Sequence, residues 1–67
     1  MIYVNGEPVQ AAANATIREL LLALDIDPER GGIAVAVDAE VARRGVWPTR
    51  RLGDGAHVEI VRAVQGG

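Results

Sequence analysis

The chain begins with two short apolar runs on either side of an Asn-Gly pair. The first nine residues read "MIYVNGEPV", in which aliphatic residues alternate with Tyr3 before Asn5 and Gly6. An Asn-Gly pair between such runs predicts a two-residue β-hairpin, because both residues tolerate the positive φ angles of a type I′ turn. Pro8 has no backbone N–H to donate, so we expect the second strand to lie at a sheet edge.

The next periodic segment, "TIRELLLAL", predicts one amphipathic helix. Thr16 followed three residues later by Glu19 is a capping box, in which each side chain satisfies a backbone N–H at the start of the helix. Pro28 prevents the helix from continuing beyond it. The apolar positions follow the i, i+3, i+4, i+7 spacing of a single stripe: Ile17, Leu20, Leu21 and Leu24.

The second half of the chain has two further strand patterns. The run "IAVAV" at 33–37 alternates large and small apolar residues, which predicts a central strand with its large side chains toward the helix. After the turn residues "GDG" at 53–55, the run "HVEIVRAV" alternates again and predicts the last strand. Residues 38–52 alternate poorly, and we assign them a turn, one or two short strands and a loop.

This order of elements predicts an α+β protein with the β-grasp (ubiquitin-like) fold. A mixed sheet of four to five strands would carry one helix packed on one face, with the last strand in the middle, parallel to the first. One helical stripe covers one sheet face, so the other face must meet water or a partner. We expect residues 1–64 to form this domain and residues 65–67 to form a flexible C-terminal Gly-Gly tail.

Composition narrows the function. A chain of 67 residues has room for a single core. No apolar stretch is long enough to span a membrane and no export signal is recognisable, so we expect a soluble, cytoplasmic protein without membrane partners. The absence of cysteine excludes disulfides and thiol chemistry, and we predict neither catalytic residues nor a metal site. The net charge of −2 argues against nucleic acid binding, and all seven basic residues are arginine.

The chain ends in "RAVQGG", directly after the last strand pattern. Small residues at a frayed terminus are one explanation. Chemically, however, two glycines pass through a channel too narrow for side chains and leave the carboxylate open to attack. A carboxylate reacts with sulfur only after ATP has converted it into an acyl-adenylate, and a thiocarboxylate can then form. The sequence has no glycine-rich phosphate loop, so another protein must use the ATP and this chain binds no cofactor.

At this point the sequence resembles the small ubiquitin-like sulfur carriers, and most closely the ThiS family of thiamine biosynthesis. The resemblance covers the whole chain and rests on "TIRELLLAL", "IAVAVD", "GDGAHVEIV" and "VQGG". It implies that a ThiF-like adenylyltransferase adenylates Gly67, with Gly66 and Gln65 as the tail that threads into partner active sites. A sulfur donor such as a cysteine desulfurase would convert Gly67 into a thiocarboxylate, which a ThiG-like thiazole synthase would use for thiazole formation. Ala56 departs from the family, whose turn often reads Asp-Gly-Asp.

The uncovered sheet face is the expected docking surface. Tyr3, Val61 and Ala63 would lie there beside the small residues of the central strand, close to the root of the tail. We expect the free protein to be a monomer. Arg43, Arg44, Arg50 and Arg51 form either a docking patch for an acidic enzyme or an ordinary solvated loop, and the sequence leaves both open.

Three single residues invite chemical roles that we do not assign. His57 has no nucleophile nearby in the sequence and is predicted to be a surface residue at a strand start. Asp54 is predicted to be a turn residue and not half of a carboxylate pair with Glu59. Trp47 is predicted to cover a core edge in preference to forming a ligand platform.

Other functions remain open at this stage. The small subunit of molybdopterin synthase, and carriers for cysteine synthesis or tRNA thiolation, share the tail chemistry. A ubiquitin-like protein modifier would use the same adenylate, although a chain without lysine cannot build lysine-linked polymers. A plain interaction domain would leave the terminus chemically idle.

Overall fold

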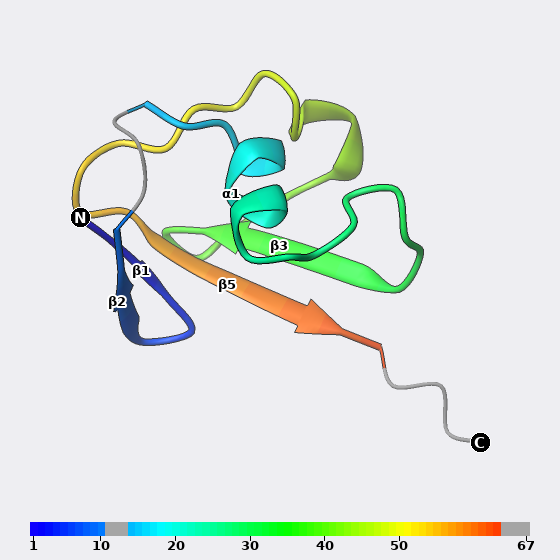
Figure 1. Ribbon diagram of the computed structural model, residues 1–67, viewed down its shortest axis with the longest axis horizontal. Helices are drawn as coiled ribbons and strands as arrows, with labels where there is room; N and C mark the ends of the chain where they lie inside the picture. Colours follow the sequence, from blue (N-terminus) through cyan, green and yellow to red (C-terminus); the bar gives the residue numbers. More distant parts are fainter. Residues whose placement is uncertain (11–13, 64–67) are drawn as a thin grey trace.

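The computed structural model of the protein describes residues 1–10 and 14–63. A five-stranded sheet with the order β2-β1-β5-β3-β4 carries one α-helix on one face (Figure 1). The predicted tail of Gln65, Gly66 and Gly67 lies outside the described residues. The elements are β1 (Ile2–Val4), β2 (Glu7–Val9), α1 (Ile17–Ala23), β3 (Ile33–Val37), β4 (Glu40–Ala42), a 3-10 turn (Arg44–Val46) and β5 (His57–Arg62).

The last strand lies in the middle of the sheet, as the sequence predicts. β5 pairs in parallel with β1, where Tyr3 lies opposite His57, and antiparallel with all of β3, from Val37 opposite Val58 to Ile33 opposite Arg62. This arrangement is the β-grasp topology. Figure 1 shows that β5 runs away from Met1 and ends at the opposite end of the sheet. The chain therefore leaves the domain from the centre of the sheet.

The predicted hairpin between β1 and β2 is confirmed. Asn5 and Gly6 have φ angles of 51° and 84°, and Ile2 pairs with Val9. The Asn5 side chain also extends the pairing of β1 with β5: Nδ2 donates to the carbonyl of Ile60 at 3.2 Å, and Oδ1 accepts from the Ile60 amide at 2.9 Å. One residue thus shapes the turn and fixes the register of β5.

The capping box at the start of α1 is confirmed. The Glu19 amide donates to the Thr16 hydroxyl at 3.1 Å, and the Thr16 amide donates to the Glu19 carboxylate at 2.8 Å. The hydrogen bond from the Thr16 backbone holds the pKa of the Glu19 carboxyl below its usual value. The next two amides, of Ile17 and Arg18, donate to the carbonyls of Arg50 and Trp47, both at 3.0 Å, so the first turn is satisfied partly by its own sequence and partly by the segment after β4.

The helix ends at Ala23, before Pro28, which the sequence analysis expected to stop it. Asp25 adopts the left-handed conformation with φ of 60°. The Asp25 amide donates to the carbonyl of Leu22 at 3.1 Å, and the Ile26 amide donates to the carbonyl of Leu21 at 2.8 Å. This is a Schellman motif, in which Ile26 is buried beside the helix end. The motif turns the chain back toward β3 without help from the proline.

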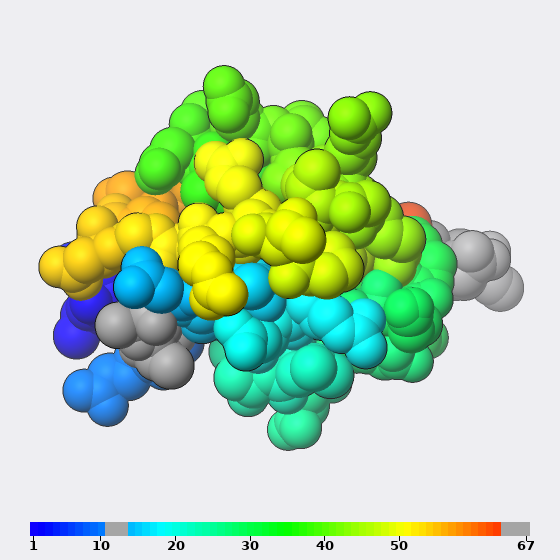
Figure 2. Space-filling model, turned by 90° about the horizontal axis from the view of Figure 1, so that it is seen from above, coloured from blue at the N-terminus to red at the C-terminus, as the bar shows by residue number. Residues whose placement is uncertain are grey.

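Two elements, α1 and the segment after β4, close the core on the helix side of the sheet. Trp47 lies in the segment after β4 and is only 3% exposed, and its indole N–H donates to the carbonyl of Ala42 at 2.8 Å. The prediction that Trp47 packs is therefore confirmed. Figure 2 shows α1 and this segment side by side over the sheet. The core consists mainly of Ile17, Leu20 and Leu21 from α1, Val35, Val37, Val58 and Ile60 from the sheet, and Trp47 and Leu52 from the segment.

The described part of the chain contains no helix with the length and apolar character needed to cross a membrane.

The turn between β3 and β4 contains an unfavourable residue. Asp38 and Ala39 both have positive φ, 49° and 69°, in a two-residue turn of the kind that favours glycine. The left-handed conformation costs a non-glycine residue about 1–2 kcal/mol. Replacement by glycine removes this cost, but part of the gain is offset because glycine also raises the conformational entropy of the unfolded chain. We expect Ala39→Gly to raise the free energy of unfolding by about 0.5–1 kcal/mol in urea denaturation.

The matched control is Ala34→Gly in β3, where the backbone is extended. Glycine inside a strand destabilises by about 0.5–1 kcal/mol, so this variant is expected to lose stability. A loss of stability in both variants would contradict the assignment of strain to the turn.

Candidate functional site

The root of the tail is held by the last contact between β5 and β3. Ile33 pairs with Arg62 at the end of the ladder, and the Ala63 amide donates to the carbonyl of Gly32 at 2.6 Å. The chain is therefore fixed to the sheet as far as Ala63, the last described residue. The predicted site of modification, Gly67, and the residues predicted to thread into partners, Gly66 and Gln65, lie outside the described residues.

The sheet face opposite α1 has no cover from the described residues, and it carries an apolar patch near the end of β5. Val61 lies opposite Ala34, and Val41 on β4 lies opposite Ala36. Val61 is 59% exposed and Val41 is 82% exposed, which is unusual for large aliphatic side chains. We call Ala34, Ala36, Val41 and Val61 the valine patch. Its position beside the tail root suits a surface that docks against another protein.

Tyr3 lies on the same face but not in the valine patch. Its ring stacks on His57 with centroids 4.9 Å apart and an interplanar angle of 12°. His57 and Val61 are four residues apart on β5, a separation of about 13 Å at the usual rise of a strand, and Glu59 lies between them. The sequence analysis placed Tyr3 beside Val61 and Ala63. The structure separates them into two clusters, because β1 meets β5 only at its beginning.

Val41 was missed in the sequence. Its segment alternates too weakly to be recognised as a strand with an inner and an outer face. The signal that could have found it is the spacing: a two-residue turn after Val37 makes 40–42 the partner of β3, which places Val41 opposite Ala36. Successive side chains of a strand point to opposite faces of the sheet, so Val41 lies on the open face when Ala42 lies in the core.

His57 and Asp54 occupy the surface positions predicted for them. His57 begins β5, and its amide donates to the carboxylate of Asp38 at 3.0 Å. Asp54 lies in the turn before β5, where it accepts a hydrogen bond from the N-terminal ammonium of Met1. That bond lowers the pKa of the Asp54 carboxyl below its usual value. Among residues 1–10 and 14–63, no three acidic or histidine side chains gather closely enough to hold a metal ion.

Arg44 serves the fold. Its guanidinium lies 4.5 Å from the centre of the Trp47 ring and donates to two carbonyls of the loop after α1, those of Pro28 and, at 2.7 Å, Arg30. The buried Trp47 ring and the Arg44 guanidinium thus fix that loop to the segment after β4.

One of the other arginines of this segment also has a contact within the fold. Arg51 donates to the carbonyl of Asn14 at 2.8 Å, which ties the segment to the residues before α1. Arg43 is exposed and Arg50 is partly buried beside the start of the helix. The structure therefore gives two of the four arginines, Arg44 and Arg51, a role within the fold.

Comparisons with known proteins agree with this geometry. The model of the ThiS family matches residues 2–67. A sulfur carrier protein, ThiS, of Thermus thermophilus is 36% identical over 67 residues, which cover all of both chains. A thiazole synthase of Magnetococcus marinus is 35% identical over 66 residues, so this chain spans only 20% of that protein. The crystal structure of a thiamine biosynthesis protein (ThiS) from Geobacter metallireducens matches with a TM-score of 0.81 and 29% identity, over 98% of this chain and 97% of that chain.

The contact between Gly32 and Ala63 can be tested by adding one methyl group. Gly32 has φ of +79°, and a Cβ there would lie 3.3 Å from the Cβ of Ala63. We expect Gly32→Ala to lower the free energy of unfolding by about 1–2 kcal/mol and to speed hydrogen exchange at the Ala63 amide.

The control is Gly31→Ala, where an added Cβ meets no atom within 4 Å. That variant is expected to change stability by about 0.5 kcal/mol or less. Equal effects of the two substitutions would show that the tail root is not fixed through Gly32.

Proposed function

The chain belongs to the ThiS family of thiamine-biosynthesis sulfur carriers, and we propose that the carboxylate of Gly67 is the group that holds the sulfur. The observation that carries this proposal is the match to a sulfur carrier over all 67 residues of both chains, through the two final glycines. The position of β5 supports it, because the described chain ends beside the central strand at one end of the sheet, where a partner protein can approach it.

The chemistry follows from the weakness of a carboxylate as an electrophile. The Gly67 carboxylate attacks the α-phosphorus of ATP, pyrophosphate leaves, and an acyl-adenylate forms. Sulfur at the oxidation level of sulfide then attacks the carbonyl carbon, the bond to AMP breaks, and a thiocarboxylate remains. Glycine at this position suits both steps, because no side chain blocks the approach to the carbonyl.

The carrier itself supplies only the acyl group. It has no cysteine to handle sulfur, no lysine and no phosphate-binding loop in its sequence. A ThiF-like adenylyltransferase therefore activates the terminus, and a donor such as a cysteine desulfurase delivers the sulfur as a persulfide. A thiol then supplies the two electrons that bring this sulfur to the level of sulfide, and that thiol ends in a disulfide. The chain acts as a protein co-substrate and not as an enzyme.

A thiazole synthase is the proposed acceptor of the sulfur. The Magnetococcus marinus thiazole synthase contains a segment similar to this chain, which supports a working association between the two activities. The valine patch lies beside the tail root on the open face, so a partner that receives the tail can cover it at the same time. Tyr3 and His57 extend this surface toward the start of β5.

The terminal chemistry is tested by intact-mass measurement. After incubation with a ThiF-like adenylyltransferase, ATP and a sulfur source, the wild-type chain is expected to gain the mass difference between one sulfur and one oxygen. A chain without Gly67 and a chain with one extra residue after it are expected to fold normally. Loss of the mass gain in both variants supports the proposal, and a gain in the extended chain would place the sulfur elsewhere.

If thiazole synthase docks on the valine patch, one charged side chain placed in the patch should weaken its binding strongly. Val61→Asp introduces a carboxylate into an apolar contact, and we expect binding to thiazole synthase to weaken about tenfold or more because that charge loses water on docking. The control is Leu22→Asp on α1, where the leucine is 52% exposed on the opposite face. Titration calorimetry measures the affinity of both variants for thiazole synthase. Equal affinities would rule out the open face as the docking surface.

A further inference from the structure

A small cavity lies directly beside the tail root. It has a volume of about 140 Å³ and is lined on one side by the loop between α1 and β3, and on the other by Arg62 and Ala63. Ala63 is hydrogen-bonded to Gly32 of the same loop, so the loop that lines the cavity is joined directly to the tail root. Any enzyme that receives the tail must bring its surface to this point.

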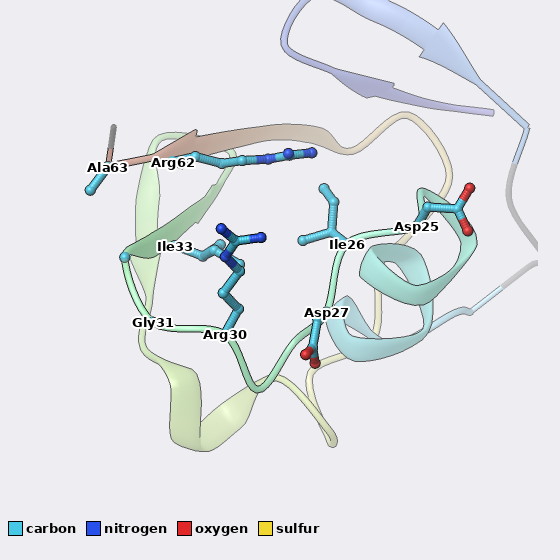
Figure 3. A pocket seen from close by; sticks show the side chains of 9 residues that line it. Asp25, Ile26, Asp27, Arg30, Gly31, Ile33, Arg62 and Ala63 are labelled. Atoms are coloured by element: carbon cyan, nitrogen blue, oxygen red, sulfur yellow. The ribbon is translucent and has the colours of Figure 1, made fainter. Parts of the chain in front are cut away.

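The basic and acidic side chains that line the cavity point in different directions. Figure 3 shows the side chains of Arg30 and Arg62 reaching into it from opposite walls, while the carboxylates of Asp25 and Asp27 turn outward. Neither guanidinium forms an ion pair with a carboxylate of the residues that the structure describes. Two guanidiniums therefore face the cavity itself, and the two carboxylates that balance their formal charge lie on its outer side.

Apolar side chains also line the cavity, next to the two guanidiniums. Ile26 is buried there and Ile33 is half-buried, while Arg30 and Arg62 are themselves exposed. A carboxylate that meets both guanidiniums forms charge-assisted hydrogen bonds, which are shorter than those between neutral groups. Each guanidinium presents a planar fork of donors that matches the two oxygens of a carboxylate.

The site is held in place before any partner arrives. Arg44 binds the carbonyl of Arg30 at 2.7 Å and that of Pro28, and it stacks on the buried Trp47. The Schellman motif at the end of α1 fixes the other end of the loop. Little ordering of the backbone is therefore required when a ligand binds.

We propose that Arg30 and Arg62 bind a carboxylate side chain of thiazole synthase, at the rim of the active site that receives the tail. This inference rests on the proposed function and adds the chemistry of the partner surface. The contact orients the carrier: the valine patch supplies apolar area on the open face, and the two arginines fix the direction in which the tail points. An acidic rim on thiazole synthase would attract the two arginines and repel the rest of this acidic chain, which favours docking by this end.

Charge reversal tests the contact. Arg30→Glu and Arg62→Glu are each expected to weaken binding to the cognate thiazole synthase about tenfold or more, and to reduce the dependence of the affinity on salt. The control, Arg50→Glu, changes the net charge by the same amount at the far end of α1, and it is expected to bind within about twofold of wild type. Thermal denaturation confirms that all three variants are folded.

The outcomes separate the inference from the proposed function. If the wild-type chain binds thiazole synthase and the Arg30 and Arg62 variants bind equally well, the inference is overturned while the carrier function stands. If the wild-type chain does not bind at all, both fail. Formation of the thiocarboxylate, measured separately by mass, shows whether the terminal chemistry survives in either case.

The absence of lysine allows a direct identification of the partner group. In Arg62→Lys the introduced amine is the only side-chain amine of the chain, and a carbodiimide joins it without a spacer to a carboxylate that it touches. We expect a cross-linked peptide containing position 62 and an Asp or Glu of thiazole synthase, and none from Arg50→Lys. Binding without such a cross-link at position 62 would contradict the proposal.

Discussion

The pairing of β5 along both of its edges is the interaction on which the rest of the structure depends. β1 binds one edge and β3 the other, and the Asn5 side chain adds two hydrogen bonds at Ile60 where the β1 backbone has already turned away. Because β5 also contributes Val58 and Ile60 to the core, its register sets the packing of α1. The same pairing fixes the point at which the chain leaves the sheet.

The small size of the chain explains why its two sheet faces differ. α1 has seven residues and cannot cover five strands, so the segment with Trp47 and Leu52 closes the rest of the inner face. No residues of the described chain cover the outer face, which leaves Val41 and Val61 exposed. A protein that must present its terminus to other proteins can use such a face, because the area left uncovered in the free domain is buried on docking.

The sequence predicted those parts of the fold that local chemistry controls. The Asn-Gly turn, the capping box of Thr16 and Glu19, and the alternation of β3 and β5 each have one physical explanation, and together they fix the β-grasp order. Features that depend on distant contacts were not predictable. The position of the helix end depends on a left-handed Asp25, and the tie between Arg44 and the loop after α1 joins residues that no local pattern relates. The separation of Tyr3 from the valine patch follows from the length of the β1 pairing, which the sequence does not reveal.

The family, the central strand and the final glycines support the account that we propose, in which a folded domain presents an acyl terminus that other proteins activate, load with sulfur and unload. The most direct test follows the sulfur atom. A chain loaded with radioactive sulfur at Gly67 is mixed with the cognate thiazole synthase and its small-molecule substrates. The account predicts that the label leaves the chain and appears in the thiazole product. Label that stays on the chain while thiazole forms from another source would contradict it.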